Sequence, residues 1–175
     1  MTSPLLYTHM PSPIGRLLLC GDELRLRGLY TAPASEHPGL ARGWRRADAP
    51  FVRMREQLEA YFAGERVEFD LPLNLDEATP FQRTVWQRLL EIPYAETISY
   101  GELAAQLGKP TAARAVGAAN GRNPIAIIVP CHRVIGSAGS LTGYAGGLER
   151  KRFLLRHEAD VSSRRFSPHE SASTA

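Results

Sequence analysis

A cysteine, a histidine and an arginine are consecutive in the stretch "IIVPCHRVIG", residues 127–136. A thiol acts as a nucleophile in its thiolate form, so a neighbouring base or positive charge makes Cys131 a candidate for nucleophilic catalysis. His132 is the adjacent base, and Glu158 is a carboxylate that could orient its ring. A buried, inert thiol is the alternative, because free cysteine is among the most buried residue types.

The composition narrows the chemistry open to this cysteine. The chain of 175 residues has only two cysteines, Cys20 and Cys131, which argues against a disulfide scaffold or a four-ligand zinc site. We therefore expect no metal, no cofactor and a reducing, cytoplasmic setting. No apolar run approaches the ~20 residues of a membrane span, and the N-terminus lacks the pattern of a secretory signal.

Positive charge is concentrated in the second half of the chain. Residues 79–165 hold 12 Lys and Arg against 6 Asp and Glu, a net charge of +6. Residues 1–78 hold 9 against 11, a net charge of −2. This asymmetry favours a polyanionic partner for the second half, with a solvated arginine-rich face as the alternative.

The elements that would position these residues fall into two units. In the first unit, apolar patterns predict strands over residues 17–20, 24–30 and 67–73 and a helix over residues 51–64. Together they make a small α/β unit over residues 1–72. A linker over residues 73–78 leads to the second unit, residues 79–160.

Two capping boxes mark helix starts in the second unit. One joins Thr79 to Gln82, with a proline directly after the threonine, and the other joins Ser99 to Glu102. The side chains expected to form the buried stripe of the first of these helices are Phe81, Val85, Trp86, Leu89 and Leu90.

The next two helices are joined by a tight turn. Gly108 ends the helix that begins after Ser99, and Thr111 is expected to cap the following one, residues 112–120. Two short helices with such a turn make a helix-turn-helix, although many helical hairpins bind nothing. The later helix is nearly smooth, with alanine and glycine at most positions and Arg114 as its one long cation, which permits close approach to a narrow surface.

The cysteine is expected at the end of a buried strand over residues 125–129. Because neighbours on a strand point to opposite faces, contact between Cys131 and His132 would need a turn or a bridging water. A glycine-rich loop and a helix over residues 148–160 follow. The tail, residues 161–175, is polar and is expected to be disordered.

Four stretches stand together in this chain: "ISYGELAAQLG", "ARAVGAANGRNP", "PCHRVIG" and "GYAGGLERKRFLLRHE". In this combination, from about residue 79 to residue 158, the chain resembles the methylated-DNA–protein-cysteine (O6-alkylguanine-DNA) alkyltransferases, and its N-terminal unit is also like theirs. The resemblance implies an α/β, ribonuclease-H-like N-terminal unit, followed by a mostly α, winged-helix-like domain with the helix-turn-helix. That second domain would carry both DNA binding and chemistry.

The resemblance implies a role for each residue of the reactive centre. Cys131 would accept the alkyl group of O6-alkylguanine by SN2 displacement, which restores guanine and leaves the protein irreversibly alkylated after one turnover. His132 would take the thiol proton through a water, and Glu158 would hold His132 in the right tautomer. Asn123 would pin the turn before the cysteine. Tyr100 would donate to the guanine ring nitrogen, so that the base leaves neutral.

Three further residues are implied in substrate binding: Val134, Tyr144 and Ala145. A backbone group of Val134 would accept from the exocyclic amine, and the amide near Ala145 would stabilise the oxygen that loses its alkyl group. Ala145 stands where several family members carry a serine, which bears on the tolerance for bulky alkyl groups. Activity on O4-alkylthymine is left open.

The helix-turn-helix would dock in the minor groove of DNA. Arg114 would intercalate to replace an extruded base, and Lys109 and Ser137 would contact phosphates. Ala113 and Gly101 would also lie against the DNA. The implied partner is double-stranded DNA with alkylated bases, bound by a monomer, with no membrane partner and with cooperative binding left open.

Three other functions fit parts of the pattern. A non-catalytic lesion sensor would carry a bulky residue in place of Cys131. A transcriptional regulator would prefer base-reading side chains on the second helix of the motif. A hydrolase would need water to regenerate its thiol, which a thioether does not allow. Repair by alkyl transfer is the hypothesis that the sequence favours.

Overall fold

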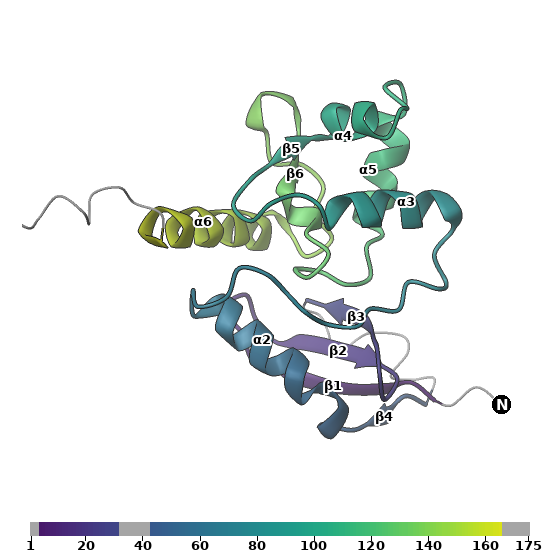
Figure 1. Ribbon diagram of the computed structural model, residues 1–175, viewed down its shortest axis with the longest axis vertical. Helices are drawn as coiled ribbons and strands as arrows, with labels where there is room; N and C mark the ends of the chain where they lie inside the picture. The colour runs from purple at the N-terminus through teal and green to yellow at the C-terminus, as the bar shows by residue number, and fades with distance from the viewer. Residues whose placement is uncertain (1–3, 32–42, 166–175) are drawn as a thin grey trace, which may run out of the picture.

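The structure is a computed structural model that describes residues 4–31 and 43–165. The N-terminal unit has a sheet of order β3-β2-β1-β4, in which β1, β2 and β3 are antiparallel neighbours and β4 runs parallel to β1. These strands are β1 (Leu6–Met10), β2 (Leu17–Gly21), β3 (Leu26–Tyr30) and β4 (Arg45–Arg46). After the 3₁₀ turn η2 (Ala49–Phe51), helix α2 (Val52–Phe62) packs across the sheet (Figure 1).

Strands β2 and β3 and helix α2 confirm the elements predicted for those stretches, but the strand predicted over residues 67–73 is wrong. This extended segment meets β3 at a single bridge, between Leu26 and Leu73. There the N–H of Leu26 donates to the carbonyl of Pro72 (2.8 Å), and the N–H of Asn74 donates to the carbonyl of Leu26 (2.8 Å). Pro72 has no N–H of its own and cannot extend the ladder.

The second unit is mostly helical. Its helices are α3 (Pro80–Leu89), α4 (Tyr100–Gln106), α5 (Ala113–Gly121) and α6 (Leu148–Arg165). Both predicted capping boxes are confirmed, since the N–H of Gln82 donates to Thr79 Oγ1 (3.1 Å) and the N–H of Glu102 donates to Ser99 Oγ (3.0 Å). A small α/β unit followed by a helical unit with a helix-turn-helix confirms the predicted fold class.

The buried stripe of α3 was predicted one residue too long. Val85, Trp86 and Leu89 are buried and Phe81 is half-buried, but Leu90 is 45% exposed. Leu90 is the C-cap of the helix. Its side chain therefore lies beyond the last full turn and leaves the apolar face.

Helices α4 and α5 form the helix-turn-helix, and Gly108, at φ +73°, makes the turn between them. The cap predicted at Thr111 is wrong: the N-cap is Ala112, and no side chain caps the helix. The N–H of Ala112 donates to the carbonyl of Lys109 (2.9 Å), so a backbone turn carries the chain past Thr111 before α5 begins.

The strand predicted to carry the cysteine is also wrong. Residues 125–129 are largely buried, as expected, but they form turns, with Ile127 at φ +70°, and only Ile125 bridges to β3, at Leu29. The side chain of Asn123 bonds to backbone groups that would pair with a neighbouring strand in a sheet. Its Oδ1 accepts from the N–H of Ile125 (2.9 Å), and its Nδ2 donates to the carbonyl of Val129 (2.7 Å). A short apolar run does not by itself distinguish these conformations.

A 3₁₀ turn, η3 (Cys131–Arg133), follows directly. It leads into the short strand β6 (Val134–Ile135), which pairs in parallel with β5 (Ile98–Ser99). A second 3₁₀ turn, η4 (Ser137–Gly139), opens the glycine-rich loop. The cysteine thus begins a helical turn between α5 and β6.

Helix α6 is longer than predicted, because residues 161–165, assigned to a disordered tail, are helical. Val161 is 1% exposed, and a Cβ on Gly64 would lie 3.1 Å from its Cγ2. Burial of Val161 against the end of α2 extends the helix by this turn. The rest of the predicted tail, residues 166–175, lies outside the described residues.

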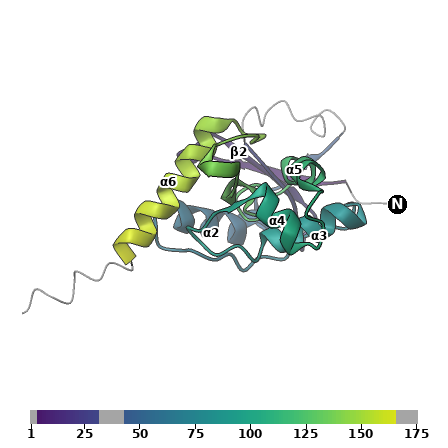
Figure 2. The ribbon, with the colours of Figure 1, turned by 90° about the horizontal axis from the view of Figure 1, so that it is seen from above.

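The two units are joined by backbone as well as by side chains. The N–H of Leu29 donates to the carbonyl of Pro124 (2.8 Å), and the N–H of Ala126 donates to the carbonyl of Leu29 (3.1 Å). One hydrophobic core extends through both units. Figure 1 shows α6 and the cysteine segment above the sheet and α2, and Figure 2 shows the same arrangement from above.

Candidate active site

Cys131 opens the turn η3 and is 6% exposed. Its thiol faces a cavity of about 160 Å³ between the end of β3 and the glycine-rich loop. The residues lining this cavity are Leu29, Tyr30, Thr31, Asn120, Gly121, Asn123, Ala126, Cys131, Gly143, Tyr144, Ala145 and Gly146. Burial raises the pKa of the Cys131 thiol, while the Asn123 amide, the Lys151 ammonium and the N–H of His132 act in the opposite direction.

His132 is fully buried behind the cysteine. Its Nε2 lies 2.8 Å from Glu158 Oε1, and its Nδ1 has no hydrogen-bond partner in the described part of the chain. Burial lowers the pKa of His132, although the Glu158 carboxylate opposes this. The ring is therefore neutral, with the proton on Nε2, where the carboxylate accepts it, and the lone pair on Nδ1. A neutral ring with a free Nδ1 lone pair is a competent base.

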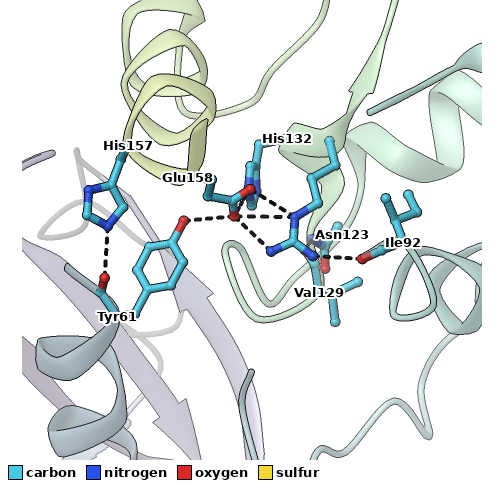
Figure 3. A network of polar contacts seen from close by, with 8 residues as sticks. Tyr61, Ile92, Asn123, Val129, His132, His157 and Glu158 are labelled. Carbon is cyan, nitrogen blue, oxygen red and sulfur yellow. Dashed lines mark hydrogen bonds and ion pairs between the residues drawn. The ribbon is translucent and has the colours of Figure 1, made fainter. Parts of the chain in front are cut away.

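The carboxylate of Glu158 accepts hydrogen bonds from side chains of helix α2 and of the turn η3 (Figure 3). It accepts from His132 Nε2, from the hydroxyl of Tyr61 (3.0 Å to Oε1) and from Arg133, whose Nη2 lies 2.8 Å from Oε1 and Nε 3.0 Å from Oε2. Burial alone would raise the pKa of Glu158, but His132 and Arg133 hold it at about 2. The carboxylate therefore remains ionised and can fix the tautomer of His132.

Arg133 and Asn120 support this centre from either side. Arg133 Nη1 donates to the carbonyl of Ile92 (2.8 Å), and its guanidinium lies over the ring of Tyr94. Asn120, at the end of α5, donates through Nδ2 to the carbonyl of Cys131 (3.3 Å). The turn η3 is thus fixed by groups from α5, α6 and the segment after α3.

The glycine-rich loop is fastened over the cavity by Tyr100 and Lys151. The Tyr100 hydroxyl, at the start of α4, donates to the carbonyl of Thr142 (3.1 Å). The fully buried Lys151 donates through Nζ to the carbonyls of Val134 (2.6 Å) and Thr142 (3.0 Å). Burial lowers the pKa of Lys151 and raises that of Tyr100. Lys151 therefore joins β6 to the loop, and Tyr100 joins the loop to α4.

A second, larger recess of about 580 Å³ opens beside α5. It is lined by Tyr100, Ala113, Arg114, Gly117, Gly121, Thr142, Gly143, Tyr144 and Ala145. Four of these residues, Gly121, Gly143, Tyr144 and Ala145, also line the cavity of the cysteine. The two recesses are therefore adjacent and share these residues as a common wall.

The residues predicted to bind DNA lie on the surface in different places. Arg114 is exposed on α5 and lines the larger recess with Ala113. Lys109, Gly101 and Ser137 are also exposed, but they line neither recess; the Lys109 ammonium lies over the ring of Phe81.

Three residues of the centre were missed by sequence reasoning: Tyr61, Asn120 and Lys151. Tyr61 stands at core spacing in its helix and gave no signal of a polar role. For Lys151 the sequence does offer a signal of a special role: the chain has 21 Lys and Arg, and only Lys109 and Lys151 among them are lysines. Arg133 was noticed beside the cysteine, but no function was assigned to it.

The described residues hold no group of three or more His, Cys, Asp and Glu side chains that could bind a metal ion. Among the helices in the described ranges, none has the length and apolar composition to cross a bilayer.

Comparisons with known proteins show which family this chain is similar to. Residues 80–160 match the family model "6-O-methylguanine DNA methyltransferase, DNA binding domain", and residues 5–75 match its ribonuclease-like domain. A methylated-DNA–protein-cysteine methyltransferase of Mycolicibacterium paratuberculosis is 53% identical over 93% of this chain and 94% of its own length.

Two solved structures from Mycobacterium tuberculosis are similar over the whole fold. Its O6-methylguanine methyltransferase is 52% identical, with a TM-score of 0.83 over 89% of this chain and 93% of the other. OGT from the same organism, in complex with DNA, is 52% identical, with a TM-score of 0.81 over 89% and 94% of the two chains.

Proposed function

This chain belongs to the O6-methylguanine DNA methyltransferase family, and from that premise we propose that Cys131 is the residue that accepts the alkyl group. Its activity is that of a methylated-DNA–protein-cysteine methyltransferase, which repairs DNA by alkyl transfer to a cysteine, and DNA is its partner. The observation that supports Cys131 is its place in the cavity wall, directly before the buried His132–Glu158 pair.

The reaction follows from the protonation states of these groups. The thiol proton passes through a water to Nδ1 of His132, whose other nitrogen is held by the ionised Glu158. The sulfur then attacks the alkyl carbon of O6-alkylguanine, the carbon–O6 bond breaks, and its electron pair stays with the base. Tyr100 donates a proton to the guanine ring nitrogen. The product at Cys131 is a thioether, from which water cannot regenerate the thiol, so each molecule acts once.

Substrate contacts are assigned to the walls of the two recesses. The guanine ring lies against Tyr144 and Ala145, and Asn123 maintains the turn that presents the thiol. Val134 is outside the lining of both recesses, and its carbonyl already accepts from Lys151 Nζ (2.6 Å), so only its second lone pair is open to the exocyclic amine. Because Ala145 brings no hydroxyl, the backbone amide near it stabilises O6. The cavity of about 160 Å³ leaves room for alkyl groups larger than methyl.

On DNA, α5 enters the minor groove and the damaged base is flipped into the larger recess. Arg114, which lines the mouth of that recess, fills the gap in the base stack. Ala113 and Gly101 allow close approach, and Lys109 and Ser137 contact phosphates. That one chain carries all these groups supports action as a monomer, and its two free, buried cysteines support a reducing, cytoplasmic setting.

Intact-protein mass spectrometry tests the proposal. The protein is mixed with duplex DNA that contains O6-methylguanine, and the adduct is located by peptide mapping. We expect one added methyl group on Cys131 in stoichiometric amount, and none in Cys131→Ala, which should still bind the damaged duplex. The control Cys20→Ala should react fully. Unmodified protein that binds the lesion tightly would indicate a sensor instead.

A further inference from the structure

We infer that Tyr61, which belongs to the N-terminal unit, is a positioning residue for alkyl transfer: its hydroxyl holds the Glu158 carboxylate that orients His132. The inference rests on the proposed transfer to Cys131. It gives the N-terminal unit a direct link to the chemistry, which the sequence analysis assigned to the second domain alone.

The geometry places Tyr61 in the same network as the reacting groups. Tyr61 is fully buried near the end of α2, and its hydroxyl donates to Glu158 Oε1 at 3.0 Å. The same oxygen lies 2.8 Å from His132 Nε2 and 2.8 Å from Arg133 Nη2. His132 and Arg133 both come from η3, so Tyr61 is the donor from the N-terminal unit (Figure 3).

The backbone of Tyr61 holds the neighbouring position of α6. Nε2 of His157 lies 2.8 Å from the Tyr61 carbonyl, and the two rings are 5.3 Å apart between centroids. One residue of α2 therefore contacts two consecutive residues of α6. This double contact fixes the height and rotation of the helix turn that carries Glu158.

The tyrosine is also kept in its donor form. Burial and the adjacent Glu158 carboxylate raise the pKa of Tyr61 well above its ordinary value. A neutral hydroxyl on Oε1 takes up part of the carboxylate's negative charge. Without it, the carboxylate attracts the Nε2 proton more strongly, and His132 becomes easier to protonate.

The other charged and titratable groups around this pair stay in place when only the Tyr61 hydroxyl is removed. Arg133 faces Glu158 and His132 from η3, Lys151 faces His132 from α6, and Tyr94 lies beside Arg133. A change in the pH dependence of transfer can therefore be assigned to the missing hydroxyl. Because neutral His132 is the active base, a higher pKa of His132 moves the acidic limb of the rate profile to higher pH.

The test compares Tyr61→Phe with Tyr94→Phe and with the unchanged protein. Tyr94 is a suitable control because its hydroxyl has no hydrogen-bond partner in the described residues, although its ring adjoins the same Arg133. Single-turnover transfer from O6-methylguanine duplex DNA is measured from pH 5 to pH 9, with DNA affinity and thermal unfolding alongside. Tyr61→Phe should react about three- to tenfold more slowly at neutral pH. Its acidic limb should lie at higher pH, and its DNA affinity should be unchanged.

Replacement of Tyr61 by 3-fluorotyrosine provides a test of opposite sign. The more acidic phenol donates more strongly and keeps the volume of the side chain, so the acidic limb should move to lower pH. An unchanged pH profile in both variants would overturn the inference, as would a shift of equal size in Tyr94→Phe. If the unchanged protein forms no adduct at Cys131, the proposed function fails and this inference fails with it.

Discussion

The ammonium of Lys151 lies 2.6 Å from the carbonyl oxygen of Val134, and it also donates to the carbonyl of Thr142 in the glycine-rich loop. Its charge opposes the rise in the pKa of the Cys131 thiol that burial causes. Lys151→Met should therefore slow transfer by about tenfold at neutral pH and raise the pKa of Cys131, since one unit of pKa changes the thiolate fraction tenfold.

The measurement is the rate of alkylation by a free alkylated base as a function of pH, which removes DNA binding from the comparison. Arg156→Met is the matched control, because Arg156 is an exposed cation on the same helix. If the pKa of the Cys131 thiol is the same in Lys151→Met as in the unchanged protein, the prediction is contradicted, and the buried ammonium only holds the loop in place.

Arg114→Ala should weaken repair of duplex DNA by at least about tenfold, because nothing else on the smooth face of α5 could fill the gap left by a flipped base. The reaction with free O6-methylguanine should be unaffected. Both rates are measured under single-turnover conditions. Arg122→Ala, an exposed arginine at the C-cap of α5, is the control. Equal losses on duplex and free base would contradict a role in flipping.

Tyr100→Phe should slow transfer by about a hundredfold, the lower end of what general-acid assistance contributes. In the structure the Tyr100 hydroxyl donates to the carbonyl of Thr142, so the proposed role requires it to exchange this acceptor for the guanine nitrogen. The rate of adduct formation under saturating DNA reports this step. An unchanged rate would remove Tyr100 from the mechanism.

Gly146→Ala should discriminate between alkyl groups by size. A Cβ at Gly146 would lie 2.6 Å from Thr31 Oγ1 and 2.8 Å from Tyr144 Cε1, so it would narrow the cavity where β3 meets the loop. Transfer from free O6-benzylguanine should fall more than transfer from free O6-methylguanine. Gly101→Ala is the control on these free bases, because its Cβ would meet only Ser99 Oγ, at 3.9 Å. A uniform loss would mean general damage to the loop.

Acid should destabilise the protein through Glu158. Its pKa falls from an ordinary 4.5 to about 2 in the fold, so the folded state binds fewer protons between these values. The associated stability is present above pH 4.5 and is lost as the pH falls toward 2, with a size of about 3 kcal/mol. His132, whose pKa is lowered from 6.5, acts in the same direction from a higher pH.

Urea unfolding at pH 7 and at pH 3.5 measures this effect. Glu158→Gln should be less stable at pH 7, because Arg133 is then buried without its carboxylate. It should also lose less stability between the two pH values. If the free energy of unfolding falls by the same amount between pH 7 and pH 3.5 in the variant and in the unchanged chain, groups other than Glu158 cause the acid sensitivity.

Sequence reasoning succeeded where a residue type dictates local geometry. The boxes at Thr79 and Ser99 and the turn at Gly108 depend on neighbours within a few positions, and all three are present. The run 125–129 was misassigned because burial suits a strand and a turn equally. Two contacts stabilise the turns instead of a strand. The side chain of Asn123 bonds to the backbone N–H and C=O groups that a neighbouring strand would otherwise pair with, and Ile125 forms a bridge to β3, which is distant in sequence.

The residues of the candidate site can also be divided into those that the sequence reveals and those that only the structure reveals. Cys131 and His132 are recognisable by type and order, Glu158 was a candidate carboxylate by type, and the resemblance supplied Tyr100. Tyr61 and Lys151 were not recognisable, because their polar atoms acquire partners only when α2, α6 and the loop are placed together. A tyrosine or lysine in an amphipathic helix looks the same in sequence whether its end reaches solvent or a buried carboxylate.

The hydrogen bond between Tyr61 and Glu158 joins residues 97 positions apart. Contacts of this separation form late in folding, because closing a long loop costs entropy before any contact can offset it. During synthesis, too, Cys131 is made before α6, which carries Glu158, because α6 follows Cys131 along the chain. A nascent chain therefore carries Cys131 as an ordinary cysteine without a partnered base. Under the irreversible transfer proposed above, the reactive centre is thus assembled only after α6 has been synthesised and has packed against α2.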